Sequence, residues 1–468
     1  MKKVNMIKRP NKRLVLFLTS LSGIVFLTAT FGIIWYTCYA QEIVQPFFRK
    51  GNWLVIAVYA LTLYIFMRIY GGFRIGYLKR SDVIYSAILS MLITNVLNYL
   101  QIGLIGRRFM NFAPMLILTI TDIFVLIIWA CFSEKLYYHL YPPRRILLIY
   151  EGNQPKGLLS KINSRSEKYN ICGAVTVAED WETICQAIGQ YEAVLICDVK
   201  SDIRNELLKY CFRQSVRVYL TPKLSDTIIR GAEAIHLFDS PLLLCRNRGL
   251  DFGQQTAKRI LDLAISLTAL VLTSPIMAII AVTIKCYDRG PVLYRQERLT
   301  EGGRIFILYK FRSMEVDAER YDGPRLASEN DTRITSVGKF LRRLRLDELP
   351  QLINIIKGEM SIVGPRPERK EIAQQYALDM PEFDFRLKVK AGLTGYAQVY
   401  GKYNTSPYDK LKMDLAYIEG YSLWLDIKII LMTIKVLFTR ESSQGLSDDA
   451  ADQLLRRGEK QQDRKSVV

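Results

Sequence analysis

The chain has 468 residues, of which half are hydrophobic, and a formal net charge of +19. This length predicts two or three domains, and the apolar fraction disfavours an entirely water-soluble protein and favours one embedded in a membrane. The basic excess suits an anionic membrane surface or phosphorylated substrates. We expect no nucleic-acid partner, because the apolar segments already favour a bilayer. His139 and His236 are the only histidines, so chemistry near the C-terminus must use carboxylates, lysine, arginine, serine, tyrosine or a metal.

The first part of the chain contains four long apolar runs, at about 14–37, 53–70, 82–105 and 114–133. A helix rises about 1.5 Å per residue, so each run can cross a hydrocarbon core of about 30 Å. Basic residues in the N-terminal tail, in the loop at 68–80 and at 141–145 favour the cytoplasmic side for both ends of this segment. We therefore predict a four-helix transmembrane bundle over residues 1–140.

Residues 145–250 have a different pattern, in which short β-rich runs alternate with helix-like segments. The β-rich runs lie at 145–150, 170–178, 193–199 and 216–221. Such alternation is typical of a parallel α/β sheet, and we predict a Rossmann-like cytosolic module here. The first turn, YEGNQPKG, lacks the G-x-G-x-x-G pattern that brings a backbone close to dinucleotide phosphates. A scaffolding or regulatory role is therefore favoured over nucleotide binding, which stays open.

A fifth apolar run, at 259–287, is long enough to span a membrane but carries Ser274 and Pro275 near its middle. A proline inside a helix removes one hydrogen bond and clashes with the preceding turn, which kinks or breaks the helix. Basic residues flank both ends of the run, so one interpretation is a re-entrant helix that enters and leaves on the cytoplasmic side. The other interpretation, a kinked ordinary span, fits the composition equally well.

Two adjacent acids, Asp347 and Glu348, stand in the sequence LRLDELPQL after the basic run KFLRRLR. The ordinary interpretation is a helix N-terminus, with Asp347 near the cap, Pro350 in the first turn and Gly358 ending the helix. Nearby cations, among them Arg345, also keep carboxylates ionised and attract polyanionic substrates. The pair is therefore a candidate site as well as a candidate cap.

Cations from further segments are predicted to join these acids. The motif VGPRPE presents Arg366 between Pro365 and Pro367, and a planar guanidinium suits phosphate oxygens. Strand-like alternation in LYKFRSM places Lys310 and Arg312 on one face. Cations beside two carboxylates indicate phosphoryl transfer, in which one carboxylate attacks phosphorus and the other holds Mg²⁺. The candidate phosphate-binding residues are Arg366, Lys310, Arg312, Arg345 and Arg333, although Arg333 could simply form an ion pair.

Six long motifs occur in order between residues 256 and 440. They are KRILDLAISL…TSPI, GPVLYRQER, FILYKFRSM, NDTRITSVGKFLRRLRLDELPQLINIIKGEMSIVGPRPE, LKVKAGLTGYAQVYGKYNTSP and DKLKMDLAYIEGYSLWLDIKII. This segment resembles the bacterial polyprenyl-phosphate hexose-1-phosphate transferases, in the class that has a single re-entrant helix. The order of four spans, an α/β module and this domain also resembles the larger members of that family.

The resemblance implies that a UDP-sugar donates hexose-1-phosphate to undecaprenyl phosphate and releases UMP. It implies that Asp347 forms a covalent phosphosugar intermediate and that Glu348 holds Mg²⁺. It also implies that the Pro-Arg-Pro unit at 365–367 grips phosphate and that the cations of FILYKFRSM lie within or beside the site. The Ser-Pro pair at 274–275 corresponds to the break of the re-entrant helix.

The complete expectation is a mixed α/β catalytic domain over 256–440, with a re-entrant helix at 259–286, followed by a polar tail at 442–468. By resemblance, this domain lies on the cytoplasmic face of the bacterial inner membrane and starts exopolysaccharide, capsule or O-antigen synthesis. No motif identifies the hexose, for which glucose or galactose is our expectation. A transporter-like subunit and a non-catalytic membrane platform of a polysaccharide export machine are the competing functions, and a homodimer is a further expectation.

Overall fold

The computed structural model describes residues 10–48, 50–152, 155–163, 165–245, 249–316, 333–401 and 405–438. They form two compact units, one ending at Thr221 and the other beginning at Pro222. This boundary falls inside the segment 145–250 for which the Rossmann-like module is predicted, and the limits of that module remain a prediction. The predicted tail at 442–468 lies outside the described residues.

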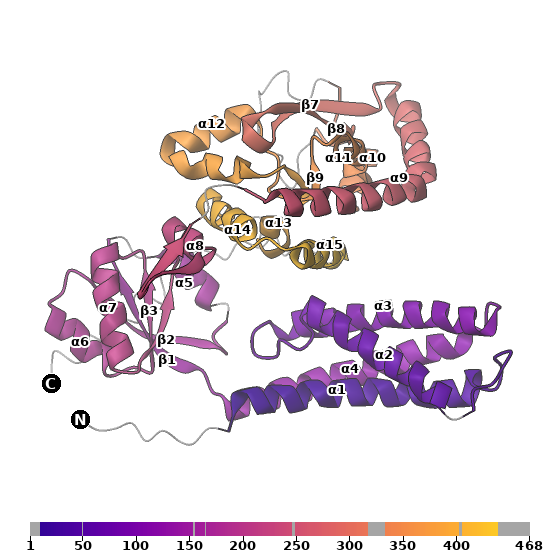
Figure 1. Cartoon of the computed structure of the whole chain (residues 1–468), viewed down its shortest axis with the longest axis horizontal. Helices are drawn as coiled ribbons and strands as arrows, with labels where there is room; N and C mark the ends of the chain where they lie inside the picture. The colour runs from indigo at the N-terminus through magenta and orange to yellow at the C-terminus, as the bar shows by residue number, and fades with distance from the viewer. Residues whose placement is uncertain are drawn as a thin grey trace. The chain divides into compact units, whose positions relative to one another are not determined.

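The first unit begins with four long helices that lie side by side (Figure 1). They are α1 (Lys12–Ile34, continued by a π-helical turn at Trp35–Tyr39), α2 (Lys50–Tyr70), α3 (Arg80–Gly106) and α4 (Ala113–Leu140). Each helix contributes fully buried residues to their shared core, for example Leu27, Tyr59, Met91 and Leu126, in chain order. Their outer faces carry exposed apolar side chains such as Phe17 and Ile128. All four helices are long and apolar enough to cross a membrane, as the sequence predicts.

The first unit continues with a four-stranded parallel sheet in the order β2-β1-β3-β4, which confirms the prediction of a parallel sheet. Its strands are β1 (Arg144–Tyr150), β2 (Tyr169–Thr176), β3 (Ala193–Cys197) and β4 (Arg217–Leu220). Helices α5 (Lys156–Asn163), α6 (Trp181–Ile188) and α7 (Ser201–Arg213) connect them. Successive side chains of β1 point to opposite faces of the sheet. Leu147 and Ile149 therefore lie in one apolar cluster, and Ile146 and Leu148 lie in another. Burial on both faces explains why these strands read as continuous apolar runs.

The second unit opens with α8 (Leu224–Arg230) and the hairpin of β5 (Glu233–Leu237) and β6 (Ser240–Leu244). The long apolar helix α9 follows at Phe252–Asp288, contains Pro275, and bends sharply in Figure 1. Proline has no N–H to donate to the carbonyl four residues earlier. The Ser274 hydroxyl donates to that carbonyl, on Val271, at 2.8 Å. The predicted break is therefore a bend within one continuous helix.

The remaining elements form a mixed α/β arrangement in which β7 (Leu293–Leu299) pairs with β8 (Ile305–Phe311) in an antiparallel hairpin. Short strands β9 (Ser361–Val363) and β10 (Gly392–Thr394) are parallel. The helices are α10 (Ser336–Arg343), α11 (Gln351–Lys357), α12 (Lys370–Asp379), α13 (Tyr396–Tyr400), α14 (Pro407–Glu419) and α15 (Leu423–Phe438). Apolar residues of β8, α11, β9, α14 and α15 share one core.

Buried polar contacts attach the first part of α9 to this core. Lys258 Nζ lies 2.6 Å from Asp426 Oδ2 on α15. Asp262 Oδ1 accepts the Ser361 hydroxyl and the Ile362 N–H, each at 3.0 Å. On α15, Asp426 faces inward while Trp424 is exposed, so this helix has one face in the core and another outside it. The apolar helix and the α/β core thus form one body.

Candidate functional site

The two adjacent acids lie in a short 3-10 turn, Leu346–Glu348, between α10 and α11. Arg345 begins the turn in the left-handed region at φ 54°, and Pro350 is the N-cap of α11. The prediction that Asp347 caps a helix containing Pro350 in its first turn is wrong, because the helix begins after the proline. Gly358 ends the helix at φ 87°, as predicted, since glycine adopts this conformation without strain.

Glu348 accepts contacts from two cations at one carboxylate oxygen. Lys310 Nζ on β8 lies 3.2 Å from Glu348 Oε1, and Arg366 Nη2 lies 3.3 Å from the same atom. Burial raises the pKa of Glu348, but Lys310, Arg366 and Arg345 lower it more, to about 2. Glu348 is therefore an ionised carboxylate throughout the neutral range.

Asp347 has a different environment, although it is the next residue. It is buried, and burial together with the neighbouring Glu348 charge raises its pKa, while Lys310 and Arg342 partly oppose the rise. Burial lowers the pKa of Lys310, and the Glu348 charge opposes that change. Two acids with pKa values shifted in opposite directions are typical of sites where the two groups have different chemical roles.

The two predicted cations of LYKFRSM separate in the structure. On β8, Phe306 and Leu308 face the core, and Lys310 follows on the same face beside the acids. The strand ends at Phe311, so alternation no longer governs the next residue. Arg312 is buried and forms an ion pair with Asp288, at the end of α9, rather than with either acid in the described contacts.

The Pro-Arg-Pro loop is fixed through its backbone. All four carbonyls of residues 365–368 accept a hydrogen bond. The donors, in order, are the Gly392 N–H (2.8 Å), Arg386 Nη2 (2.9 Å), Arg298 Nη1 (3.1 Å) and the Leu299 N–H (3.0 Å). Arg366 also donates from Nη1 to Gln398 Oε1 at 3.2 Å. The two prolines have fixed φ angles, so the Arg366 guanidinium extends from a rigid base.

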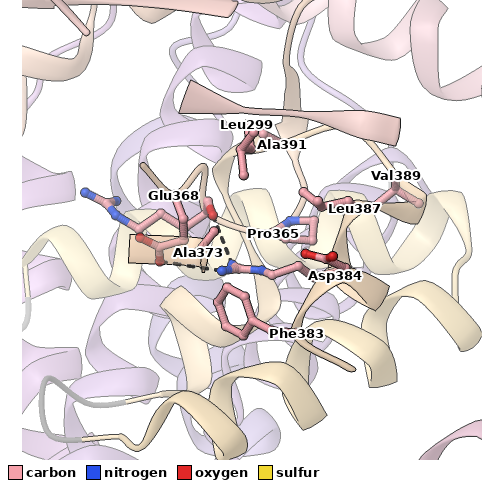
Figure 2. Close-up of a pocket in the computed structure, with 11 residues that line it drawn as sticks. Leu299, Pro365, Glu368, Ala373, Phe383, Asp384, Leu387, Val389 and Ala391 are labelled. Atoms are coloured by element: carbon pink, nitrogen blue, oxygen red, sulfur yellow. Dashed lines mark hydrogen bonds and ion pairs between the residues drawn. The ribbon is translucent and has the colours of Figure 1, made fainter. Parts of the chain in front are cut away.

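Arg386 forms the buried anchor of this loop. Its guanidinium pairs with Glu368 at 3.5 Å and with Asp414 at 2.9 Å, and it lies 4.9 Å from the centre of the Phe383 ring. Figure 2 shows the pocket around this anchor, with Glu368 and Phe383 in its wall and Pro365 beside them. Its volume is about 10 Å³, close to the lower limit for one water molecule, so this pocket is too small to hold a nucleotide sugar.

The other predicted site residues occupy different places. Arg345 lies in the turn that carries the acids, and its charge acts on Glu348. The carbonyl of Arg333 accepts the Glu315 N–H at 2.9 Å, and its role in phosphate binding stays a prediction. Ser274 and Pro275 lie at exposed positions inside α9. The structure thus brings Asp347, Glu348, Lys310, Arg366 and Arg345 together around one turn.

A magnesium ion fits this site only if the substrate completes its coordination. Within the described ranges, no three His, Cys, Asp or Glu side chains form a group that could hold a metal by themselves. Mg²⁺ commonly uses one or two protein carboxylates together with substrate phosphates and water. Glu348 and Asp347 can supply such oxygens, and both described cation contacts to Glu348 use Oε1 alone.

Sequence reasoning missed two buried residues that support the site, Asn354 and Arg386. Asn354 is fully buried in α11 and stands in the otherwise apolar run LINII. A polar residue on an apolar helix face usually has a specific partner, and that signal was present in the sequence. Arg386 gives no such signal, because arginine is common in a surface helix.

A sequence profile described as bacterial sugar transferase matches residues 253–440. The UDP-N-acetylgalactosamine-undecaprenyl-phosphate N-acetylgalactosaminephosphotransferase of Aeromonas hydrophila is 36% identical over 257 residues, which are 53% of this chain and 60% of that protein. The UDP-glucose:undecaprenyl-phosphate glucose-1-phosphate transferase of Klebsiella pneumoniae is 41% identical over 220 residues, 46% of this chain and 45% of that protein. A protein of the same name from Caulobacter vibrioides is 38% identical over 193 residues, 40% of this chain and 71% of that protein. The chain thus spans less than two thirds of the first two relatives.

Proposed function

The chain belongs to the bacterial sugar transferase family, and from that premise we propose that it transfers hexose-1-phosphate from a UDP-sugar to undecaprenyl phosphate and releases UMP. The observation that carries the proposal is the convergence of Lys310 and Arg366 on Glu348, at 3.2 and 3.3 Å, beside the buried Asp347. Preorganised cations next to a carboxylate suit a reaction in which phosphate charge must be bound while the carboxylate attacks.

We infer a double displacement at Asp347. In the first half-reaction, an oxygen of the Asp347 carboxylate attacks the phosphorus that bears the sugar and forms an O–P bond. The P–O bond of the diphosphate bridge breaks, and UMP leaves with the electron pair. In the second half-reaction, a phosphate oxygen of the lipid attacks the same phosphorus, and the bond to Asp347 breaks, which restores the carboxylate.

The surrounding residues have separate roles in this proposal. Arg366 binds non-bridging phosphate oxygens through its planar guanidinium. Lys310 limits the pKa rise of Asp347, so that the nucleophile is available as the anion. Glu348 stays ionised because its pKa is about 2 and would hold Mg²⁺ together with substrate phosphate oxygens. Such an ion would neutralise phosphate charge.

The proposed location is the cytoplasmic face of the bacterial inner membrane. We propose that α1–α4 form a transmembrane bundle and that the bent α9 is re-entrant, so that both of its ends stay cytoplasmic. The apolar exterior of α9, with exposed residues such as Val271 and Ile279, supports its insertion into a bilayer. The parallel sheet at 144–220 would be a Rossmann-like scaffold or regulatory module, and a homodimer remains part of the proposal.

The hexose stays open between related sugars. The relatives in Aeromonas hydrophila and Klebsiella pneumoniae are named for N-acetylgalactosamine and glucose, and a third, in Salmonella typhimurium, is named for galactose. We propose glucose or galactose, in the first step of exopolysaccharide, capsule or O-antigen synthesis. A panel of UDP-sugars decides this directly.

The test uses the full chain in membranes, supplied with undecaprenyl phosphate, Mg²⁺ and each UDP-sugar in turn, with UMP release as the measurement. One sugar should support release, chelation of Mg²⁺ should stop it, and Asp347→Asn should abolish it. Mass spectrometry of protein treated with donor alone should find a sugar-phosphate adduct on Asp347. Full turnover by Asp347→Asn would exclude this residue as the nucleophile.

The same assay separates the competing functions. A transporter-like subunit would move a lipid-linked sugar without releasing UMP from any donor. A non-catalytic platform would also release none, although its deletion would alter polymer assembly in cells. Removing residues 145–221, which end at the boundary between the two units, then tests the parallel sheet without the second unit. Transfer that persists while polymer length changes indicates a regulatory role.

A further inference from the structure

Asn354 lies in α11 and makes directional contacts to β8, the strand that carries Lys310. Its Oδ1 accepts the N–H of Tyr309 at 3.0 Å, and its Nδ2 donates to the carbonyl of Ile307 at 2.7 Å. Nδ2 also lies 2.6 Å from Glu359 Oε2. The side chain is fully buried, so both amide hydrogens and the carbonyl oxygen are engaged without solvent.

The carboxamide contacts the strand as a neighbouring peptide group would. Ile307 and Tyr309 are two residues apart, so their backbone groups point to the same edge of β8. β7 pairs with β8 from Leu293 to Leu299 in the antiparallel hairpin. Asn354 therefore satisfies backbone groups of β8 in addition to that pairing, and shifting β8 along its axis would break both hydrogen bonds.

The other described contacts between α11 and β8 constrain the position of β8 along its axis less. Ile355 and Leu308 pack in the shared apolar core, and apolar packing is non-directional. Lys357 Nζ contacts the Tyr309 hydroxyl at 3.0 Å, but this lysine is exposed and such surface contacts are weak. The buried carboxamide is thus the specific tether next to Lys310.

We propose that Asn354 is a positioning residue, which sets the register of β8 against the turn before α11 and thereby holds Lys310 on Glu348. Lys310 directly follows Tyr309, so a slip of the strand at Tyr309 moves the ammonium group by a similar amount. The kinetic part of this inference rests on the proposed sugar-phosphate transfer, in which a misplacement of about 1 Å can cost roughly 100-fold in rate.

The decisive experiment is a four-member set: wild type, Asn354→Ala, Lys310→Met and the double variant, each assayed for UMP release. If Asn354 acts through Lys310, Asn354→Ala lowers kcat/KM about 10-fold or more in the wild type but changes little once Lys310 is Met. Equal fold-losses in both backgrounds would overturn the proposal. Ile355→Val is the matched control, because it loosens the same helix without touching the tether.

The Michaelis constant gives a second readout that simple destabilisation does not move. Partial unfolding lowers the amount of active enzyme and leaves KM for the UDP-sugar unchanged. A displaced Lys310, which now lies 3.2 Å from Glu348 Oε1, should instead change KM in Asn354→Ala in the same direction as Lys310→Met does. A loss of activity in Asn354→Ala that leaves KM at the wild-type value while Lys310→Met changes it would contradict the proposal, and Ile355→Val should match the wild type.

Failure of the proposed function is distinguishable from failure of this inference. If the wild-type protein releases no UMP from any donor, the proposed reaction is excluded. The position of Lys310 must then be measured in a structure. An experimental structure of Asn354→Ala then decides, because Lys310 Nζ should leave Glu348 Oε1, from which it lies 3.2 Å. Retention of that contact without Asn354 would refute the claim.

Discussion

Replacing Lys310 with methionine tests the electrostatics of the site. The change removes the charge and keeps a flexible apolar stem, so packing on β8 should change little. The pKa of Glu348 is about 2 instead of its ordinary 4.5, a difference of about 3 kcal/mol at roughly 1.4 kcal/mol per pKa unit. Lys310 is the largest of the cationic contributions to this lowering, ahead of Arg366 and Arg345, so we assign about half of this energy to it.

The expected loss in kcat/KM is therefore about 10- to 100-fold, or about 1.5 to 3 kcal/mol. UMP release from the preferred UDP-sugar measures it, with a thermal unfolding curve to confirm that the variant folds. Lys357→Met is the matched control, because this exposed lysine contacts the Tyr309 hydroxyl of β8 at 3.0 Å and not the acids. Equal activity of Lys310→Met and Lys357→Met would refute the assigned role of Lys310.

Three further predictions follow from the described contacts. UMP release should fall as the pH drops through the pKa of Asp347, which burial raises above 3.8. Glu348 stays ionised down to a pH of about 2. A pH–rate profile with its acid limb below 3.8 would assign that limb to another group. Arg386→Met leaves buried carboxylates without their cation and should lower the free energy of unfolding by about 3 kcal/mol, measured by denaturation in detergent, whereas an unchanged midpoint contradicts the anchoring role. Pro275→Ala restores an N–H and should straighten α9, so spin labels near its two ends should move apart; an unchanged distance means that packing causes the bend.

Much of the fold follows from the pattern of apolar residues. The four N-terminal helices and the buried strands β1 and β3 lie close to their predicted ranges, although α4 continues seven residues past its predicted end, to Leu140. The strands are buried on both faces and the helices expose apolar outer faces, so both kinds of segment read as continuous apolar runs. The hairpin of β5 and β6 was not predicted, since most of its residues are exposed and lack alternation. The bend of α9 was located by Pro275, but the Ser274 hydrogen bond that keeps the helix continuous depends on a rotamer that sequence does not specify.

The sequence predicted which charged residues form the site, because each of them stands in a recognisable motif. As expected, Glu348 contacts Lys310 and Arg366, because a buried charge is stable only when it is paired with an opposite charge. Arg312 departs because β8 ends at Phe311, where alternation stops being a guide. The start of α11 was misplaced because Arg345 takes a left-handed conformation at φ 54°. A non-glycine residue rarely adopts this conformation, so the local sequence does not predict it.

The backbone hydrogen bonds that fix residues 365–368 have a consequence for the order of events. A guanidinium on a fixed base presents its donors at one place. In the proposed double displacement, donor and acceptor phosphates would use that place in turn, with UMP leaving before the lipid phosphate binds. The fixed backbone of this loop thus favours sequential use of Arg366 by the two proposed substrates.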